Sequence, residues 1–425
     1  MIDTQIQDLI AGEQQRQRDG LELIPSENYV SRDVLNALGS VLTNKYSEGY
    51  PGRRYYGGQE FTDQIEQLAI DRAKLLFGAD HANVQSHSGA PANEAVYSAW
   101  LEPGDTVLAM DLSHGGHLTH GAAVTRSAQL YNFVRYKMKD IETGEIDYDE
   151  LRTLALEHKP KIILAGFSAY PRELDYERFA AIGNEVGALL MADMAHIAGL
   201  IAGGVAKNPL DYGFHVITTT THKTLRGPRG GTILSRGVVG NPLKAPEKTL
   251  ANIPTLIDRA VFPGMQGGPH MHVIAAKAVA FEEALRPEFK EYAAQIVKNA
   301  TALAAAMQEK GFHLITGGTS NHLILADVYR SFGINGKEVE IALDKIGLTL
   351  NANSTPDDLL PRFTPSGIRL GTPAITTRGL REEHMPLIAD WMKRAVDVRT
   401  DETALSRLRE EVKLFVQEFP LPSDQ

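Results

Sequence analysis

A lysine, an aspartate and a serine–glycine pair each follow a short run of residues that predicts a strand. Lys223 follows the threonines 218–221, Asp193 follows the apolar run 188–192, and Ser88 and Gly89 lie between a short strand and a helix. A lysine among small and polar residues suits a Schiff base, because a sheltered site lowers the pKa of its amine. A carboxylate at the carboxyl end of a buried strand lies where open α/β sheets place their ligand crevice.

The small residues Ser88, Gly89 and Ala90 predict a phosphate site, because a helix start offers free backbone N–H groups to an anion. Each feature alone also has an ordinary explanation, a tight turn for Ser88–Ala90 and a helix N-cap for Asp193. Together they form a phosphate cradle, an acid for a pyridinium nitrogen and a Schiff-base lysine. These are the requirements of pyridoxal 5′-phosphate, which the sequence therefore predicts as the cofactor.

Other ligands lack their sequence signals. The chain has no GxGxxG and no GxxxxGK[ST] motif, which dinucleotide and P-loop sites would show. His114, His117 and His120 are spaced three apart across two glycines, without an acid inside the cluster, and this is not helical metal-ligand geometry. We therefore predict no metal; one imidazole stacked on the cofactor ring is favoured, with loop capping for the other two histidines.

The composition indicates a globular enzyme without a nucleic-acid or membrane partner. The 425 residues are 43% hydrophobic and 23% charged, with a formal net charge of −10 and no basic block that would attract nucleic acid. The apolar window 187–206 contains Asp193, His196 and four glycines, which a membrane span would bury at high cost. Zero cysteines exclude disulfides and fit a reducing compartment, and the N-terminal stretch is polar rather than a secretory signal, so we expect a cytoplasmic protein.

The elements that must position these residues follow an α/β pattern. Short apolar runs predict strands at 82–85, 106–110, 161–165, 188–192, 216–221 and 231–235. Helical spacing predicts helices at 62–77, 92–100 and 176–186, the first ending at Gly78. The unbroken apolar run in 188–192 favours a parallel sheet covered on both faces.

A second, smaller α+β domain is predicted near the C-terminus. A Pro/Gly stretch at 262–269 precedes a helix at 270–285, and strands at 322–327 and 367–371 flank a helix at 337–346. We expect an N-terminal arm and interface segment over 1–74, a large cofactor-binding α/β domain over 75–272, and a small C-terminal domain over 273–425.

Long motifs make the chain resemble the serine hydroxymethyltransferase family from LIPSENY at 23–29 almost to its C-terminus. They are YSEGYPGRRYYGG, HSGAPAN, HGGHLTHG, DMAHIAGL, TTTTHKTLRGPRGG, FPGMQGGPH and SGIRLGTPA. The resemblance implies a type I aminotransferase-like fold with a mostly parallel central sheet and bound pyridoxal phosphate. It also implies reversible one-carbon transfer between serine and tetrahydrofolate, giving glycine and 5,10-methylenetetrahydrofolate through a quinonoid form of the cofactor on glycine.

The same resemblance implies a cofactor role for each matching residue. Lys223 would hold the cofactor, Asp193 would pair with its pyridine nitrogen, and His117 would stack on its ring. His222, beside the lysine, would tune substrate specificity. The other implied cofactor contacts are Ser88, Gly89, Ala90, Ser168, His196, Gly267 and Gly268, the last two in the neighbouring subunit's site.

Substrate roles follow in the same way. Arg369 would clamp the serine carboxylate with two parallel hydrogen bonds, assisted by Ser26. Glu48 is the candidate for moving a proton at the serine hydroxyl or the folate, although its ordinary explanation is a solvated loop acid. Tyr46, Glu48, Tyr55 and Tyr56 would complete the neighbouring subunit's site in a homodimer, or in a tetramer of such dimers, with Tyr56 among the catalytic groups. The remaining implied substrate contacts are Leu112, Gly116, Leu118, Asn353 and, within the lysine motif, Arg229.

One departure and two alternatives stay open at this point. Pro91 stands where the family commonly has Gln; the helix start tolerates proline, but an amide near the phosphate is lost. A folate-independent aldolase acting on β-hydroxy amino acids is the second enzyme hypothesis, and it would not need Glu48 and its tyrosines. A catalytically silent folate- or RNA-binding relative is the third, and the intact Lys223, Asp193 and Arg369 argue against it.

Overall fold

The computed structural model describes residues 3–237 and 248–424. Their contacts form two compact units. The sheet unit comprises Val30–Asp140 and Glu145–Ala294, and the terminal unit comprises Met1–Tyr29, Ile141–Gly144 and Gln295–Gln425. None of the helices in the described ranges is long and apolar enough to cross a membrane. The three-part division predicted from the sequence stays a prediction.

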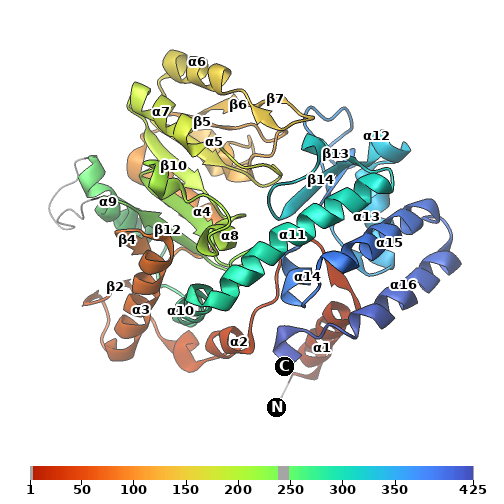
Figure 1. Ribbon diagram of the computed structural model, residues 1–425. Helices are drawn as coiled ribbons and strands as arrows, with labels where there is room; N and C mark the ends of the chain where they lie inside the picture. The colour runs from red at the N-terminus through yellow and green to blue at the C-terminus, as the bar shows by residue number, and fades with distance from the viewer. Residues whose placement is uncertain (1–2, 238–247, 425) are drawn as a thin grey trace. The chain divides into compact units, whose positions relative to one another are not determined.

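The centre of the sheet unit is a seven-stranded sheet with the order β4-β12-β11-β10-β9-β5-β6 (Figure 1). All neighbouring pairs from β11 to β6 are parallel, and β12 runs antiparallel to both β11 and β4. The strands are β4 (His81–Asn83), β5 (Thr106–Met110), β6 (Asn132–Tyr136), β9 (Ile162–Gly166), β10 (Leu189–Asp193), β11 (Val216–Thr220) and β12 (Gly231–Ser235). The predicted α/β fold with a mostly parallel sheet is thereby confirmed.

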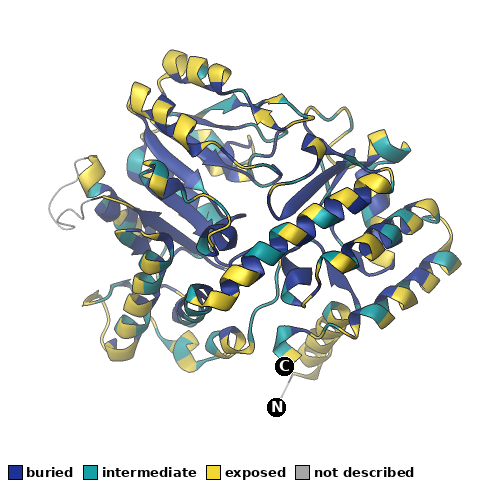
Figure 2. Cartoon of the chain, in the orientation of Figure 1, coloured by how far each residue is buried: buried dark blue, intermediate teal, exposed yellow. Residues whose placement is uncertain are grey.

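Helices cover this sheet, and its central strands are buried. Every residue of β9, β11 and β12 is buried, and these strands are dark blue in Figure 2. Ile162, Leu189 and Val216 share one apolar cluster with residues of α4 and α9. The helices are α2 (Arg32–Leu38), α3 (Glu60–Phe77), α4 (Gly89–Trp100), α5 (Arg126–Leu130), α6 (Tyr148–His158), α7 (Tyr176–Val186), α8 (Ala198–Ala202), α9 (Ile253–Arg259) and α10 (Met271–Leu285).

The terminal unit is an α+β layer built on the four-stranded antiparallel sheet β13-β14-β17-β16. Its core contains Trp391, Ile324 and Leu370. Its strands are β1 (Leu21–Glu22), β13 (His313–Leu314), β14 (Leu323–Asp327), β15 (Leu348–Thr349), β16 (Asn351–Asn353) and β17 (Gly367–Gly371). Its helices are α1 (Thr4–Asp19), α12 (Val328–Phe332), α13 (Gly336–Lys345), α14 (Pro373–Thr377), α15 (Met385–Asp397) and α16 (Glu402–Val416), and α11 (Pro287–Glu309) spans both units.

The predicted strands agree with the observed ones to within two residues, but β6, β13, β16 and the strands of the two-stranded sheets were not predicted. The β6 sequence NFVRY is only partly apolar, because this edge strand is half exposed. Gly78 ends α3 as predicted, with the left-handed φ of +63° that a glycine adopts without strain. Pro91 lies in the first turn of α4, where the missing N–H costs no helical hydrogen bond.

Candidate active site

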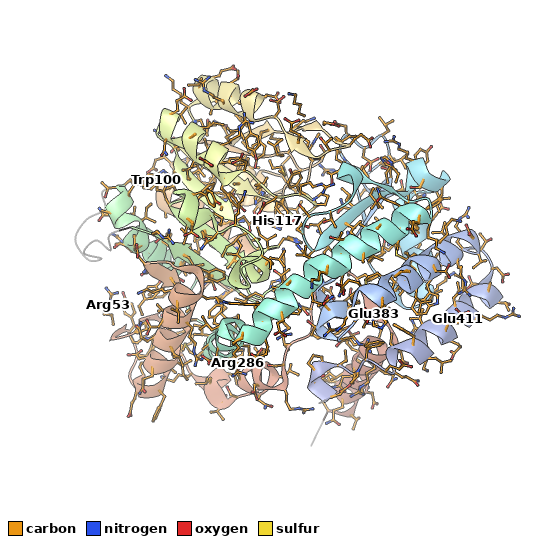
Figure 3. All side chains as sticks on the ribbon, viewed as in Figure 1. Arg53, Trp100, His117, Arg286, Glu383 and Glu411 are labelled. Carbon is orange, nitrogen blue, oxygen red and sulfur yellow. The ribbon has the colours of Figure 1, made fainter. Side chains whose placement is uncertain are left out.

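One edge of the central sheet gathers the side chains that the sequence singled out for chemistry. Asp193 ends β10, Lys223 follows β11 by three residues, and His117 (labelled in Figure 3) follows β5. Ser88 follows β4, which runs in the same direction as β11 because β12 is antiparallel to both. Their common location follows from strand direction, since parallel strands end at the same edge.

Three donors fix the Asp193 carboxylate. His120 Nε2 donates to Asp193 Oδ2 at 3.1 Å, and Asn93 Nδ2 of α4 donates to the same oxygen at 2.8 Å. The backbone N–H of Ala195 donates to Oδ1 at 3.1 Å. His120 Nδ1 accepts the His117 N–H at 3.1 Å, so the proton that His120 shares with Asp193 resides on Nε2.

This environment keeps Asp193 ionised. Burial by itself would raise the pKa of the carboxyl, but the hydrogen bond from His120 acts in the opposite direction. The hydrogen bond from Asn93 adds to this effect, and the pKa lies well below its usual value. The site therefore presents a fixed anion that can pair with a protonated ring nitrogen.

The loop that carries Lys223 is fastened to α8. Thr224 Oγ1 donates to the His196 carbonyl at 2.9 Å and accepts the Gly199 N–H at 2.9 Å. A Cβ on Gly199 would collide with the Thr224 carbonyl, so only glycine permits this close approach. His196 and Lys223 are thus held on adjoining segments, both next to Asp193 in the sheet order.

His222 is the most strongly perturbed histidine in the described part of the chain. Burial, followed by the charges of Arg229, Lys223 and Lys277, lowers the pKa of His222 to about 3. Its Nδ1 is buried and has no hydrogen-bond partner among the described residues. Arg229 itself is exposed and acts on His222 through its charge. The imidazole is therefore neutral at physiological pH, with one ring nitrogen left for a ligand.

The start of α4 has the features of a phosphate site. Ser88 is its N-cap residue, but its side chain makes no capping hydrogen bond. A Cβ on Gly89 would lie 2.7 Å from Thr220 Cγ2, so glycine brings the helix start against β11. Ser86 Oγ and Thr220 Oγ1 are buried without hydrogen-bond partners among the described residues. Free N–H groups and unpaired hydroxyls here fit an anion of several oxygens.

These residues fit pyridoxal phosphate better than a metal ion. Nitrogen and oxygen atoms of His117, His120 and Asp193 lie within 4.8 Å of one another, a spacing that a cation could use. Asp193 Oδ2, however, already accepts two hydrogen bonds, and His117 Nδ1 accepts the Thr119 N–H at 3.1 Å. The polar atoms without partners among the described residues lie instead near the start of α4, at Ser86 Oγ and Thr220 Oγ1, and on His222, at Nδ1. The first two suit a phosphate group, and the third suits a polar substituent of the cofactor ring.

A tight turn after β5 positions the residues expected near folate. The Ser168 N–H donates to the Gly115 carbonyl at 2.6 Å, which joins the loop after β9 to this turn. A Cβ on Gly116 would collide with the Met110 carbonyl. Leu112 is half-buried, whereas Leu118 is 56% exposed beside His117. An exposed leucine here offers an apolar surface beside His117.

The aromatic loop and the Gly267–Gly268 pair lie together. Tyr46 Oη donates to Glu48 Oε1 at 2.9 Å, and the Tyr46 and Tyr56 rings meet edge to face at 5.1 Å. A Cβ on Gly268 would lie 2.7 Å from Tyr46 Cε2, and one on Gly267 would lie 3.1 Å from Glu48 Oε1. Tyr46, Tyr55 and Tyr56 are 53%, 74% and 48% exposed. The cluster thus presents aromatic surface and a carboxylate to the outside of the chain.

The terminal unit holds the three remaining residues. Arg369 on β17 donates from Nε to Asn351 Oδ1 on β16 at 3.1 Å, and Asn353 pairs with Gly367 in the same ladder. Burial lowers the pKa of Arg369 to about 10, which leaves its guanidinium charged at neutral pH. Ser26 follows Pro25, which packs on Gly371 at the end of β17. Ser26, Asn353 and Arg369 are therefore gathered around one strand.

Two groups of the site were not predicted from the sequence, and a third has a role beyond the predicted one. Asn93 joins Asp193, Thr119 and Thr218, and it was not singled out. Lys277 was also overlooked, although it is 1% exposed. His120 caps the loop as predicted, since its Nδ1 accepts the His117 N–H, and its Nε2 also hydrogen-bonds Asp193. The available signal was a polar residue within an otherwise apolar helical pattern, at Asn93 in α4 and at Lys277 in α10.

Comparisons with known proteins identify chains that are similar to this one along most of its length. The family model described as "Serine hydroxymethyltransferase" matches residues 1–392. A curated protein of the same name from Xanthomonas campestris pv. campestris strain B100 is 54% identical over 419 residues, which cover 99% of this chain and 97% of that protein. The protein of that name from strain 8004 shows the same identity and coverage.

Proposed function

Since the chain belongs to the serine hydroxymethyltransferase family, a pyridoxal-phosphate enzyme that transfers a one-carbon unit between serine and tetrahydrofolate, we propose a role for each residue of its site. When bound, pyridoxal phosphate supplies the electron sink for the charge left on the serine Cα as the Cα–Cβ bond breaks. The chain's own residues must bind the cofactor, orient the substrate and move protons. Nothing in the comparisons favours the folate-independent aldolase.

Lys223, Asp193 and His117 would hold the cofactor. Lys223 Nζ would bind its aldehyde carbon, and Asp193 would keep its ring nitrogen protonated by staying ionised. His117 would stack on the ring, with its orientation set by the bond from the Thr119 N–H. The start of α4, with Ser88, Gly89 and Ala90, would bind the phosphate. His196, Ser168 and the neutral His222 would face the ring's polar substituents.

Arg369 and Ser26 would orient the substrate. A planar guanidinium binds a carboxylate with two parallel hydrogen bonds, so it fixes rotation as well as position. This rotation decides which bond of the substrate stands perpendicular to the cofactor ring. Support comes from the hydrogen bond that Arg369 Nε donates to Asn351 Oδ1, which fixes the orientation of a guanidinium that stays charged at neutral pH. Folate would lie against Leu112, Gly116, Leu118 and Asn353, with Arg229 nearby.

Glu48 would move the proton at the serine hydroxyl or at the folate, and it would do so in the site of a second copy of the chain. The three tyrosines around it are too exposed for core residues. Phe61, Leu68 and Leu75 recur every seven residues along one face of α3 and are 68%, 44% and 72% exposed. This apolar stripe supports a homodimer in which Tyr46, Glu48, Tyr55, Tyr56, Gly267 and Gly268 complete the partner's site.

We also propose a cytoplasmic location. The absence of cysteine from all 425 residues supports a reducing compartment. The formal net charge of −10 gives no electrostatic reason to bind nucleic acid or an anionic membrane surface.

The observation that carries these assignments is the ionised Asp193 fixed by His120 and Asn93, one strand away from Lys223. The test is Lys223→Gln. We expect serine turnover to fall by more than about a thousandfold while circular dichroism stays unchanged. Borohydride reduction followed by mass spectrometry should attach the cofactor to the unmodified enzyme and not to the variant. The exposed Lys207→Gln is the matched control, and normal turnover by Lys223→Gln would refute the assignment.

A further inference from the structure

Lys277 is a buried cation that the mechanism above does not use. It lies on α10, is 1% exposed and has three acceptors, one for each of its ammonium N–H groups. Nζ donates to the carbonyls of Val84 at 2.6 Å, Gly231 at 2.7 Å and Ser86 at 3.1 Å. Lysine is rarely buried so deeply, and here three backbone carbonyls satisfy its ammonium group.

The three carbonyls belong to the backbone that forms the phosphate cradle. Val84 and Ser86 lie in the segment from β4 to the start of α4, and Gly231 begins β12. The Gly231 N–H also donates to the Ser86 carbonyl at 2.9 Å, and a Cβ on Gly231 would collide with the Ser88 carbonyl. Lys277 therefore joins the two segments directly behind Ser88.

Neighbouring residues leave room for this lysine. A Cβ on Gly230 would collide with Lys277 Cε. The Gly230 carbonyl accepts the Thr221 N–H at 3.1 Å, in the loop that leads to His222 and Lys223. The ammonium is thus enclosed between the phosphate cradle and the loop of the cofactor-binding lysine.

The charge of Lys277 acts on the cofactor site. Burial lowers the pKa of Lys277 to about 7, and the charge of Glu66 opposes this shift. Among the causes that lower the pKa values of His87, His222 and His270, after burial, is the charge of Lys277. A dianionic phosphate bound at the start of α4 would offset the cost of burying this ammonium.

We propose that Lys277 is a positioning residue for the cofactor phosphate: it fixes the backbone of the cradle through three carbonyls and supplies the positive charge behind it. The proposal rests on the assignment of Ser88, Gly89 and Ala90 to the phosphate. The lysine does not touch the phosphate; it acts through the backbone and through its field. It should therefore matter for a phosphorylated ligand and not for the same ligand without its phosphate.

The test compares pyridoxal phosphate with pyridoxal, which lacks the phosphate, on the apoenzyme of Lys277→Gln. The dissociation constant of pyridoxal phosphate, measured by absorbance titration, should rise on the order of tenfold. That of pyridoxal should change by less than about twofold. If the affinities for both ligands fall equally, Lys277 has only a general structural role. If neither affinity falls, Lys277 has no role in binding. Either result would overturn the proposal.

Two controls separate an effect on ligand binding from a loss of stability. The matched variant Arg72→Gln removes a cation that donates to the Ala278 carbonyl of the same helix at 2.8 Å, away from the cradle, and both dissociation constants should stay unchanged. If Lys277→Gln folds poorly, Lys277→Met replaces it, and the ligand-induced rise in Tm is compared for the two ligands. If the unmodified apoenzyme binds pyridoxal phosphate and pyridoxal equally well, the assignment of the phosphate site is wrong. This result differs from those that contradict the role of Lys277, so the two failures are distinguishable.

Discussion

At the scale of single residues, Arg369 shows why the shape of a charged group matters as much as its charge. Its guanidinium is fixed by Asn351 Oδ1 at 3.1 Å, and the residue is half-buried on β17. In Arg369→Lys the charge stays, but one ammonium does not reproduce two parallel hydrogen bonds to a carboxylate. We expect serine binding to weaken by about 1–3 kcal/mol, measured as the serine dissociation constant. The exposed Arg330→Lys is the control, and unchanged serine binding would assign the carboxylate to another residue.

His222 gives a pH prediction with a definite sign. Its pKa is about 3 in the fold and about 6.5 in an unfolded chain, so between these values only the unfolded chain binds the proton. Stability therefore rises with pH through this window, and going from pH 7 to pH 5 costs about 2 kcal/mol at this residue. We expect the free energy of unfolding of apo His222→Asn, measured with urea, to fall between pH 7 and pH 5 by about 2 kcal/mol less than that of the unmodified apoenzyme. If His222→Asn loses as much stability as the unmodified apoenzyme, the proton taken up on unfolding binds to another residue.

At the scale of elements, the short hairpin of β2 (Gly49–Tyr50) and β3 (Arg53–Arg54) holds Glu48 in place. Arg54 Nη1 donates to the carbonyls on either side of Glu48, those of Ser47 at 2.8 Å and Gly49 at 2.9 Å. Its other nitrogens donate to Asp63 and Glu66 of α3 at 2.8 Å and 2.6 Å. One guanidinium thus fastens the aromatic loop to a helix.

Arg54→Lys should misplace Glu48 because a single ammonium does not span these four acceptors. We expect kcat of the folate-dependent reaction to fall by roughly tenfold to a hundredfold, with the serine dissociation constant unchanged. Exchange of the glycine α-proton without folate, followed by NMR, should stay near normal. Arg53→Lys on the same hairpin, whose side chain is exposed at the edge of the molecule in Figure 3, is the matched control. Equal loss in both assays would indicate general damage to the fold.

At the scale of the whole molecule, the proposed shared site has a direct test. Glu48→Gln and Lys223→Gln chains, each inactive in the folate-dependent reaction, are mixed and allowed to exchange subunits. If the loop and the lysine of one site come from different chains, each mixed dimer has one site with both defects and one intact site. With about half of the dimers mixed, roughly a quarter of normal activity should return. Exchange confirmed by native mass spectrometry without recovery would contradict the shared site.

The sequence predicts those site residues whose positions depend only on the elements next to them in the chain. Lys223, Asp193 and Ser88 each adjoin a strand, and the apolar runs of those strands predict a parallel sheet that brings their ends to one edge. The same runs predicted most of the central strands, whereas β6 was missed because an edge strand buries too little to have a clear apolar pattern. What the sequence determined by itself was therefore the cofactor class, the α/β fold and the residues that follow its strands.

Only the tertiary structure decided which groups surround those residues. Asn93 and His120 lie 100 and 73 residues from Asp193 in the chain, yet both donate to its carboxylate. Lys277 lies 193 residues from Val84, whose carbonyl it binds. Such partners depend on how helices pack on the sheet, and packing is set by the shapes of many side chains together rather than by any local pattern. Strand ends can be predicted from local periodicity, but the hydrogen bonds that tune their charges exist only once the helices are in place.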